Sequence, residues 1–425
     1  MRKLLCVVLS SALVMPLMAE AAKKKDTTPP APAPAAEKPA TPVIKPAATG
    51  PTLSDILANS GVTISGTVDA SWDFSDVDGG PNNTLGTPPT GVVAFVPLHA
   101  FDTAENAFSL HQVNLTVAKQ PSEGAGFLVN VIGGDDAGII GGKQADLDLT
   151  QGFLSYTTGG LTVIGGRFVT LAGLEVINPA SNLNASRGLL FTLLQPITHT
   201  GVRATYKIGS AASLTAGVNN SAAIFDYSAL SAPIATGSLK NENNTSKTLE
   251  LQAGFTPSSS VGAFLTYYRG EEDTDTIGGV SGEGSQTKQL TDLVVTANFG
   301  MLTVGLNGDY LTLEANENAN SISNLHAWGA AGYVGANLGK LRTALRGEYV
   351  NFDLGSAAGG SGLWAREVTL TFGYKVASSL ELIVEGRHDE IDTVGGAASL
   401  PLRDTSVDAA NDDQYTGTIK GILTF

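Results

Sequence analysis

From residue 62 onward, apolar side chains alternate with polar or small ones in segments of about ten residues. In the final segment, for example, Ile419 and Leu423 fall on one side of a two-residue period, and Thr418 and Lys420 fall on the other. A period of two places successive side chains on opposite faces of an extended strand. Glycine, asparagine, aspartate, serine and proline separate the segments, as they do between strands. The alternation therefore predicts an all-β chain whose strands have one apolar face and one polar face.

Sixteen such segments can be counted, and we expect each to form one strand. Strand numbers of 14 and 18 remain open, because the alternation is weak in 125–133 and 212–219. All ten prolines after residue 52 fall between the expected strands, where the missing N–H removes no ladder hydrogen bond. The expected strands are 62–75, 105–118, 125–133, 147–157, 160–169, 198–208, 212–219, 246–255, 260–269, 289–299, 301–312, 326–338, 340–352, 364–376, 378–389 and 413–425.

The connections between these segments alternate between long and short, beginning with the long connection 76–104. Transmembrane antiparallel β-barrels have this rhythm, with an even number of strands, short turns at one rim and long loops at the other. A soluble β-sandwich does not require it. A lipid-facing half also accounts for a charged content of only 15% and a mean hydropathy of +0.10 without a helical membrane span. We therefore expect a transmembrane antiparallel β-barrel of about 16 strands over residues 53–425.

The first 52 residues are expected to precede the barrel. Residues 1–21 have a basic start, an apolar stretch and small residues near position 21, which together predict a secretory signal peptide. Residues 22–52 are rich in proline, alanine and lysine, and they predict a disordered periplasmic linker. Contact of this linker with the anionic cell wall is one hypothesis, and a solvated spacer is the simpler one. Signal peptide and barrel together predict the outer membrane of a Gram-negative bacterium.

Charge and cysteine content argue against several other classes of protein. The chain carries 25 Lys and Arg against 40 Asp and Glu, and a net charge of −15 disfavours nucleic-acid binding. Its single cysteine, Cys6, lies in the expected signal peptide, which excludes a disulfide scaffold and cysteine-ligated metal centres. No H-E-x-x-H or G-x-S-x-G motif occurs. The sequence therefore predicts no enzyme, no cofactor and no metal site, and an acid–base site at His388-Asp389-Glu390 is less favoured than a solvated rim.

Three spaced patterns in the first half of the chain carry a family resemblance. The patterns are Leu53, Leu57, Gly61 to Gly66 and Asp69; Gly165 to Phe168, Gly173 to Glu175, Asn182, Ser186 and Arg187; and Pro196 with His199 to Val202. They cover roughly residues 53–210, and beyond 210 only the strand rhythm matches. On these residues the chain resembles the bacterial outer-membrane porins of the β-barrel porin-2 (OmpL-like) family.

The resemblance implies a water-filled channel for passive diffusion of small hydrophilic solutes or ions. It also implies contact with outer-membrane lipid and lipopolysaccharide, and a homotrimer as in general porins. Phe425 resembles the aromatic C-terminal residue that the barrel assembly machinery reads. An alternative function is that of a structural or adhesive outer-membrane barrel with little conductance.

The connection 170–197 is the third long one, and it is unusually apolar for a loop. A loop surrounded by solvent would not need its many leucine, isoleucine and valine side chains. General porins fold their third loop into the lumen, so by resemblance this segment is a candidate pore constriction that presents Glu175 and Arg187. Packing on the rim or at a subunit contact is an equally favoured alternative.

Charged side chains on the polar side of the strands are candidates for lining the lumen. Rings of such charges set ion selectivity in pores, although pairing across strands is the simpler interpretation for any single residue. Arg167 shares its parity with Leu161 and Val163, so a lumen position would require a β-bulge near Gly165-Gly166. The remaining lumen candidates are Arg203, Lys207, Arg342, Arg346, Glu348, Glu381, Glu385 and Arg387.

Overall fold

The structure of this 425-residue protein is a computed structural model. The chain divides into two units, Met1–Val62 and Thr63–Phe425. In the first unit, Ser60 Oγ donates a hydrogen bond of 2.9 Å to Leu57 O within a helical turn. The expected signal peptide 1–21 and linker 22–52 lie outside the residues that the structure describes. The described residues are Leu57, 59–76, 98–102, 104–141, 146–221, 245–273, 285–315, 324–353, 362–394 and 413–425.

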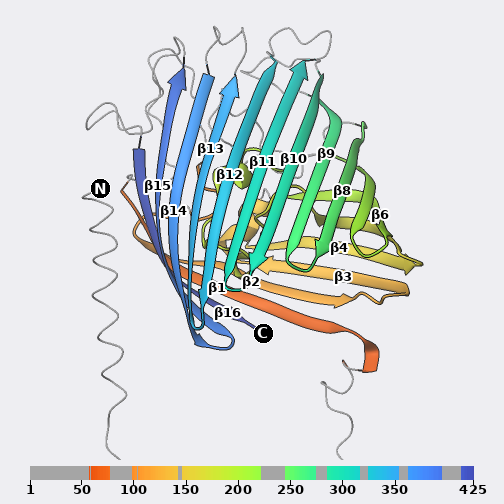
Figure 1. The fold of residues 1–425 in the computed structure, drawn as a ribbon, viewed down its shortest axis with the longest axis horizontal. Coiled ribbons are helices and arrows are strands. Elements are labelled where there is room, and N and C mark those ends of the chain that lie inside the picture. Colours follow the sequence, from red (N-terminus) through yellow and green to blue (C-terminus); the bar gives the residue numbers. More distant parts are fainter. Residues whose placement is uncertain are drawn as a thin grey trace, which may run out of the picture. The chain divides into compact units, whose positions relative to one another are not determined.

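The second unit is a closed antiparallel β-barrel of sixteen strands (Figure 1). Each strand pairs with its neighbours in the sequence, and β1 pairs with β16 to close the sheet. The prediction of sixteen strands is confirmed, including the two weak segments. The strands are β1 (Thr63–Ser75), β2 (Ala107–Lys119), β3 (Gly124–Gly133), β4 (Leu147–Thr158), β5 (Leu161–Val169), β6 (Thr198–Ile208), β7 (Ala212–Asn219), β8 (Thr248–Ser258), β9 (Val261–Asp273), β10 (Ser285–Phe299), β11 (Leu302–Ala315), β12 (Leu325–Leu338), β13 (Leu341–Asp353), β14 (Gly362–Ala377), β15 (Leu380–Val394) and β16 (Asp413–Thr424).

Several strands extend beyond the predicted ends, among them β9, β11 and β15, and for β10 and β8 the reason can be identified. β10 begins at Ser285 and not at 289, because residues 285–288 continue the hydrogen-bonded ladder with β9. Polar residues on both faces conceal such an extension from any reading of apolar alternation. Pro257, expected between strands, lies inside β8, where the pairing register with β9 shifts between Phe255 and Ser258. A proline is tolerated at such an irregularity because no ladder hydrogen bond is lost there.

The seam between β1 and β16 is completed by the last residue of the chain. Gly66 N donates a hydrogen bond of 2.9 Å to Phe425 O, and Phe425 N donates one of 3.1 Å to Gly66 O. The Phe425 ring approaches Gly66 so closely that a Cβ at position 66 would collide with the ring and with Asn114 O. Glycine is therefore required at this position, because backbone and ring approach too closely for a side chain.

The outer and inner faces of the strands differ as the alternation predicts. On β14, Val368 and Leu370 are exposed on the outside, whereas Glu367 and Thr369 are buried inside the barrel. An exposed apolar band of this kind is the lipid-facing surface of an outer-membrane barrel. Among the described residues, no helix is long and apolar enough to cross a membrane.

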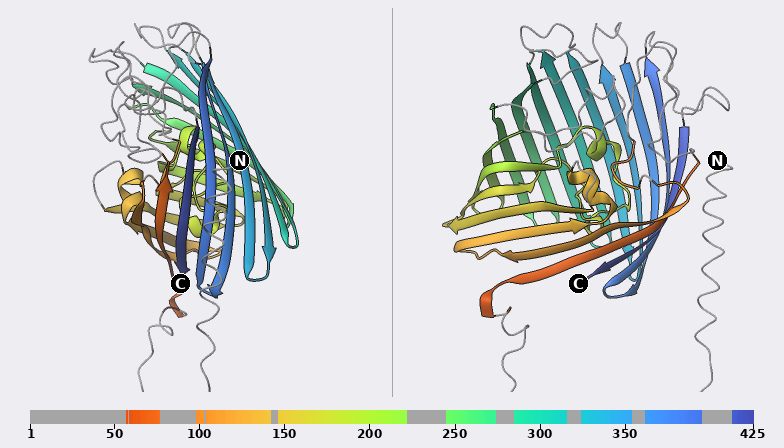
Figure 2. Two further views of the ribbon diagram at one scale, coloured as in Figure 1. Left: turned by 90° about the vertical axis from the view of Figure 1, so that its left-hand side faces the viewer. Right: turned by 180° about the vertical axis from the view of Figure 1, so that it is seen from behind.

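Several described segments between the strands pack inside the barrel. Residues 170–197 carry the short 3₁₀ turn η2 (Pro179–Ser181) and the helix α5 (Leu189–Leu193), which packs on β12, β13 and β14. The helix α4 (Asp135–Gly141) lies against β2, β3 and β4. Both helices can be followed in Figure 2, α4 in orange and α5 in yellow-green. The long connection 170–197 therefore packs on the inner wall.

Part of this inner wall is apolar, which corrects the expectation that one face of every strand is polar. Leu189 and Leu190 of α5 are buried against a patch of inward-pointing apolar side chains on the strands, with exposed fractions of 0% and 1%. At several of these positions the pattern is inverted: Phe352, for example, points inward, and the flanking Asn351 and Asp353 lie on the other face, so the two-residue period alone cannot identify the inner face. The patch includes Leu290, Leu311, Leu313, Val350, Phe352 and Leu363.

The substitution Gly66→Ala is expected to destabilise the folded barrel by roughly 1–3 kcal/mol, because the added methyl group overpacks the β1–β16 seam. The measurement is the denaturant midpoint of the protein folded in detergent. The matched control is Gly332→Ala on β12, where an added Cβ would meet no atom within 4 Å. Equal midpoints for the two variants would show that the seam tolerates a side chain.

Candidate pore constriction

Arg346 is the centre of the contacts that hold segment 170–197 to the wall. It projects inward from β13 and is fully buried, with an exposed fraction of 0%. Its guanidinium donates hydrogen bonds to Glu175 Oε1 at 2.7 Å, to Ser186 O at 2.7 Å and to Glu367 Oε1 at 2.8 Å. A buried charge is strongly unfavourable unless it is paired and hydrogen-bonded. Arg346 therefore joins two residues of the segment to a carboxylate on the neighbouring strand.

Two wall carboxylates accept hydrogen bonds from backbone N–H groups of the same segment. Glu385 on β15 accepts from Ala185 N at 2.6 Å and from Ser186 N at 2.8 Å. Glu348 on β13 accepts from Leu190 N at 2.9 Å, in the first turn of α5. The first N–H groups of a helix have no partner within the helix. The carboxylates thus supply the acceptors that a short buried segment lacks.

Arg387 on β15 joins segment 170–197 to a second segment inside the barrel, residues 98–102. It donates to Arg187 O at 2.6 Å and to Leu98 O at 2.9 Å, and its charge is paired with Asp389 at 2.6 Å. His99 Nε2 lies 3.2 Å from the same Asp389 carboxylate. Burial and the nearby Arg387 guanidinium lower the pKa of His99, so its ring is neutral at neutral pH.

Residues near both ends of segment 170–197 are held by strands further round the barrel. Gly173 N donates to Asp292 Oδ2 on β10 at 3.1 Å. Gln195 donates to Asn307 Oδ1 at 2.9 Å and to Asp309 Oδ2 at 2.8 Å, both on β11. The segment is thus hydrogen-bonded to β10 and β11 as well as to β13 and β15, and it lies across the inner face of these strands.

Arg187 uses its charge within the segment itself. Its guanidinium donates to Val176 O at 3.1 Å and to Ala185 O at 2.9 Å, and it also bonds Ile177 O. The guanidinium carbon lies 5.0 Å from the centre of the Phe101 ring, within the range of a cation–π contact. Because only 2% of Arg187 is exposed, this side chain shapes the segment from within.

Most of the other lumen candidates are also engaged in contacts. Arg203 pairs with Glu250 at 2.5 Å, and Arg342 pairs with Glu381 at 2.7 Å and bonds Leu183 O of the segment. Lys207 is exposed near the short-turn end of β6, on the same side of the strand as Arg203. The parity that the sequence assigned to these residues therefore places them inside the barrel.

Arg167 is placed differently from the expectation. The pairing of β5 with both neighbours runs without interruption through Gly165 and Gly166, so the bulge that a lumen position required is wrong. Arg167 shares its side of β5 with Leu161, and its guanidinium donates to Leu149 O at 2.8 Å. The opposite side of β5 carries Phe168, which is buried. The guanidinium carbon of Arg203 lies 4.2 Å from the centre of the Phe168 ring.

Sequence reasoning missed the partners of the predicted charges. Glu367, Asp389 and Glu250 all lie on the inner face of a strand, yet nothing local distinguishes them from solvated acids. Asp292 and Asp309 likewise alternate with apolar residues. This alternation could have placed both side chains on the inner face, but it could not have identified the residues of segment 170–197 that they contact. The pairs form between strands and segments that are distant in the sequence, so only the closed barrel shows them.

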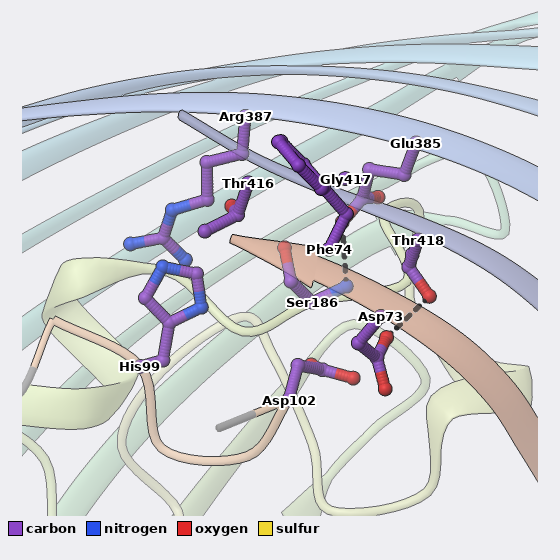
Figure 3. A pocket seen from close by; sticks show the side chains of 10 residues that line it. All are labelled: Asp73, Phe74, His99, Asp102, Ser186, Glu385, Arg387, Thr416, Gly417 and Thr418. Carbon is purple, nitrogen blue, oxygen red and sulfur yellow. Dashed lines mark hydrogen bonds between the residues drawn. The ribbon is translucent and has the colours of Figure 1, made fainter. Parts of the chain in front are cut away.

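A small cavity lies between segment 98–102, Ser186 and the strands β1, β15 and β16. Its volume of about 20 Å³ is enough for about one water molecule. Figure 3 shows Arg387 and His99 on one side of the cavity and the carboxylates of Asp73 and Asp102 on the other. The cavity thus borders two charged groups of opposite sign.

Comparisons with known proteins identify a family and similar folds for this barrel. The family model described as "Putative beta-barrel porin-2, OmpL-like" matches residues 61–425. The fold is similar to that of an anion-selective porin from Comamonas acidovorans (13% identity, 86% of this chain and 99% of that chain covered, TM-score 0.55). It is also similar to the outer-membrane channel DcaP of Acinetobacter baumannii (12%, 86% and 97%, TM-score 0.54) and to the trimer form of OmpT of Vibrio cholerae (12%, 86% and 99%, TM-score 0.55). No curated protein sequence matches the chain.

The substitution Arg346→Met is expected to destabilise the folded protein by roughly 3–5 kcal/mol, because Glu175 and Glu367 remain buried without their partner. The denaturant midpoint in detergent measures this loss. The control is Arg366→Met, which removes the exposed pair of Arg366 with Glu390 and should change stability by at most about 1 kcal/mol. A similar loss in both variants would contradict the central place given to Arg346.

Proposed function

Because the chain belongs to the β-barrel porin-2, OmpL-like family, it is an outer-membrane porin, and we propose that segment 170–197 sets the width of its channel. As a porin it is a channel for passive diffusion in the outer membrane of a Gram-negative bacterium. We propose that transport involves no covalent step, and that the permeating species are small hydrophilic solutes or ions.

The observation that carries the constriction is the fastening of the segment to separate parts of the inner wall. Glu385 and Arg346 hold residues 185–186 to β15 and β13, and Asp292 holds residue 173 to β10. A segment bonded only at one end could swing out of the lumen. Bonds to several strands support a fixed obstacle inside the channel, with Glu175 as part of its attachment.

This arrangement also changes the role we propose for the charged candidates. Arg187, Arg346 and Arg387 are at most 2% exposed, so their charges are compensated by buried partners. A compensated charge acts weakly on a passing ion. We propose that these residues, together with Glu348, Glu385 and the pair of Arg342 with Glu381, govern selectivity indirectly by fixing the segment. Arg203, paired with Glu250, would act on the adjoining wall, and the exposed Lys207 would act on solutes directly.

The surroundings of the barrel are proposed on the same basis. We propose a homotrimer, supported by the trimer form recorded for OmpT of Vibrio cholerae, whose fold is similar. Outer-membrane lipid and lipopolysaccharide would contact the exposed apolar band. The exposed ring of Phe425 at the seam is proposed as the assembly signal, residues 1–21 as a signal peptide and 22–52 as a periplasmic linker.

The alternative of a structural barrel with little conductance is favoured by the amount of chain packed inside. The apolar patch under α5 and a second buried cluster around Phe101, Ile140 and Phe191 both exclude water from part of the lumen. Single-channel recording with the pure, folded protein in planar bilayers separates the two functions. We expect discrete conductance steps, and a consistent lack of conductance would support the structural barrel.

The constriction can be tested with one substitution at two places in the segment. Leu190→Asn puts an unpaired amide against the apolar patch, which should detach α5 and enlarge the single-channel conductance. Val176→Asn makes the same polar change at a residue that is 42% exposed, and it should leave the conductance nearly unchanged. If Leu190→Asn folds and conducts like the native protein, the segment does not limit the channel.

A further inference from the structure

A group of acidic side chains and one histidine lies on the inner face of the β1–β2 region, apart from the arginine contacts described above. Asp73 projects inward from β1, His111 from β2, and Asp102 from segment 98–102. His111 Nε2 lies 3.1 Å from Asp73 Oδ2 and 3.4 Å from Asp102 Oδ1. Figure 3 shows the carboxylates of Asp73 and Asp102 close together at the edge of the cavity. Three ligand-type atoms thus converge at one point.

A break in the strand pairing aims His111 into this group. Along β1 and β2, Asp69 pairs with Gln112 and Ala70 pairs with Leu110, so His111 has no partner in the ladder. In consequence His111 and Gln112, which are adjacent in sequence, are both buried on the inner side, with exposed fractions of 2% and 0%. Bulges that redirect a side chain in this way are concentrated at functional sites.

A further carboxylate fixes the orientation of the imidazole. His111 Nδ1 lies 3.2 Å from Asp136 Oδ1 on α4, and Gln112 Nε2 donates to Asp136 Oδ2 at 2.7 Å. Donation from Nδ1–H to Asp136 leaves Nε2 as the nitrogen that faces Asp73 and Asp102. Metal-binding histidines characteristically give their second ring N–H to a carboxylate in this manner.

The group holds more negative charge than its neighbours compensate. Lys420 Nζ lies 2.8 Å from Asp102 Oδ1 and 3.4 Å from Asp69 Oδ2, and the Arg187 guanidinium is close enough to act on both carboxylates. Two further buried carboxylates, Asp73 and Asp136, contact only His111 among the charged groups of the described residues. Asp69 is 1% exposed, yet neither of its carboxylate oxygens accepts a hydrogen bond from the part of the chain that the structure describes. Asp102 Oδ2 likewise accepts no hydrogen bond from the described residues. Buried carboxylate oxygens of this kind call for a cation.

A neutral imidazole cannot satisfy this geometry by itself. The Ser71 hydroxyl has one proton and lies 2.5 Å from Asp73 Oδ2 and 2.8 Å from His111 Nε2. With Nδ1–H given to Asp136, the lone pair of Nε2 would face the oxygens of two carboxylates. An additional proton, on the ring or on a carboxylate, or a metal ion must lie between these atoms.

We propose that Asp73, Asp102 and His111 bind a divalent transition-metal ion of the Zn²⁺ type, with Asp69 adding negative charge beside it. For bonds of about 2.0–2.2 Å, the ligand atoms of a tetrahedral site are about 3.3–3.6 Å apart. The separations of 3.1 and 3.4 Å at His111 Nε2 are close to this range. The adjoining cavity has room for one water as a fourth ligand. Calcium fits less well, because it takes six to eight oxygen ligands.

The three ligands explain why spacing did not predict the site. They come from two strands and from a segment between them, and the bulge that turns His111 inward is not visible in the alternation. A metal ion here would bind segment 98–102 to the wall, next to the point where Arg387 already holds Leu98 O. The site does not depend on the channel function proposed above.

The experiment uses Co²⁺ as a spectroscopic substitute for Zn²⁺ with the full chain folded in detergent and stripped of metal. We expect one Co²⁺ per chain, the visible absorption of tetrahedral cobalt, and loss of that absorption when Zn²⁺ is added. His111→Asn and Asp102→Asn should each weaken binding at least 100-fold, and Asp136→Asn, which only orients the imidazole, about 10- to 100-fold. Asp102 lies outside the strands, so its variant preserves the ladder if His111→Asn does not fold.

The matched control is His388→Asn. His388 also lies near a carboxylate, with Nε2 3.5 Å from Asp413 Oδ2, but this pair is partly exposed on the outer face. The variant should bind Co²⁺ like the native protein. Absence of the cobalt absorption in the folded native protein would overturn the proposal and assign an additional proton to His111 or to a carboxylate facing it. Absorption that persists in folded Asp102→Asn and His111→Asn would overturn it as well.

Discussion

Closure of the sheet is the constraint on which the rest of this molecule depends. In a bilayer no water is present to pair with backbone N–H and C=O groups, so a β-sheet in the membrane must have no free edge. Here the edge is removed by β1 and β16, down to the mutual hydrogen bonds of Gly66 and Phe425. A closed wall creates two unlike surroundings, lipid outside and an interior space, and the alternation of side chains follows from them.

The interior imposes a second condition on the same wall. Where segment 170–197 excludes water, each charge of the wall must find a partner. The segment supplies both hydrogen-bond donors and acceptors: its backbone N–H groups donate to Glu385, and the carbonyl oxygen of Ser186 accepts from Arg346. Without the segment these side chains could be solvated; with it they become its attachments. Segment and wall are therefore adapted to one another, and neither can be changed alone at these points.

The sequence predicted the wall far better than its contents. Strand number and most strand ends follow from a local period, and the apolar character of 170–197 correctly indicated a packed segment. Parity also placed Arg346, Glu348 and Glu385 inside. It could not show that they are buried, because burial depends on a segment more than 150 residues away in sequence. Arg167 and the inner apolar patch were misjudged because the period shows only that two faces differ; it does not show which face points inward, and around Phe352 the inward face is the apolar one.

The interior is electrostatically uneven, and this bears on how it works. Around β13 and β15, Arg346 and Arg387 are each paired with buried carboxylates, and the remaining carboxylates there, Glu348 and Glu385, accept hydrogen bonds from segment 170–197. Around β1 and β2, four aspartates outnumber Lys420 and the nearby Arg187, and neither oxygen of Asp69 accepts a hydrogen bond from the described residues, so negative charge there is left uncompensated. Compensated charges hold the segment in place whatever the ionic conditions, since buried pairs are little screened by salt. An uncompensated cluster must instead take a proton or a cation from its surroundings, so the β1–β2 side is where the state of the interior depends on the composition of the medium.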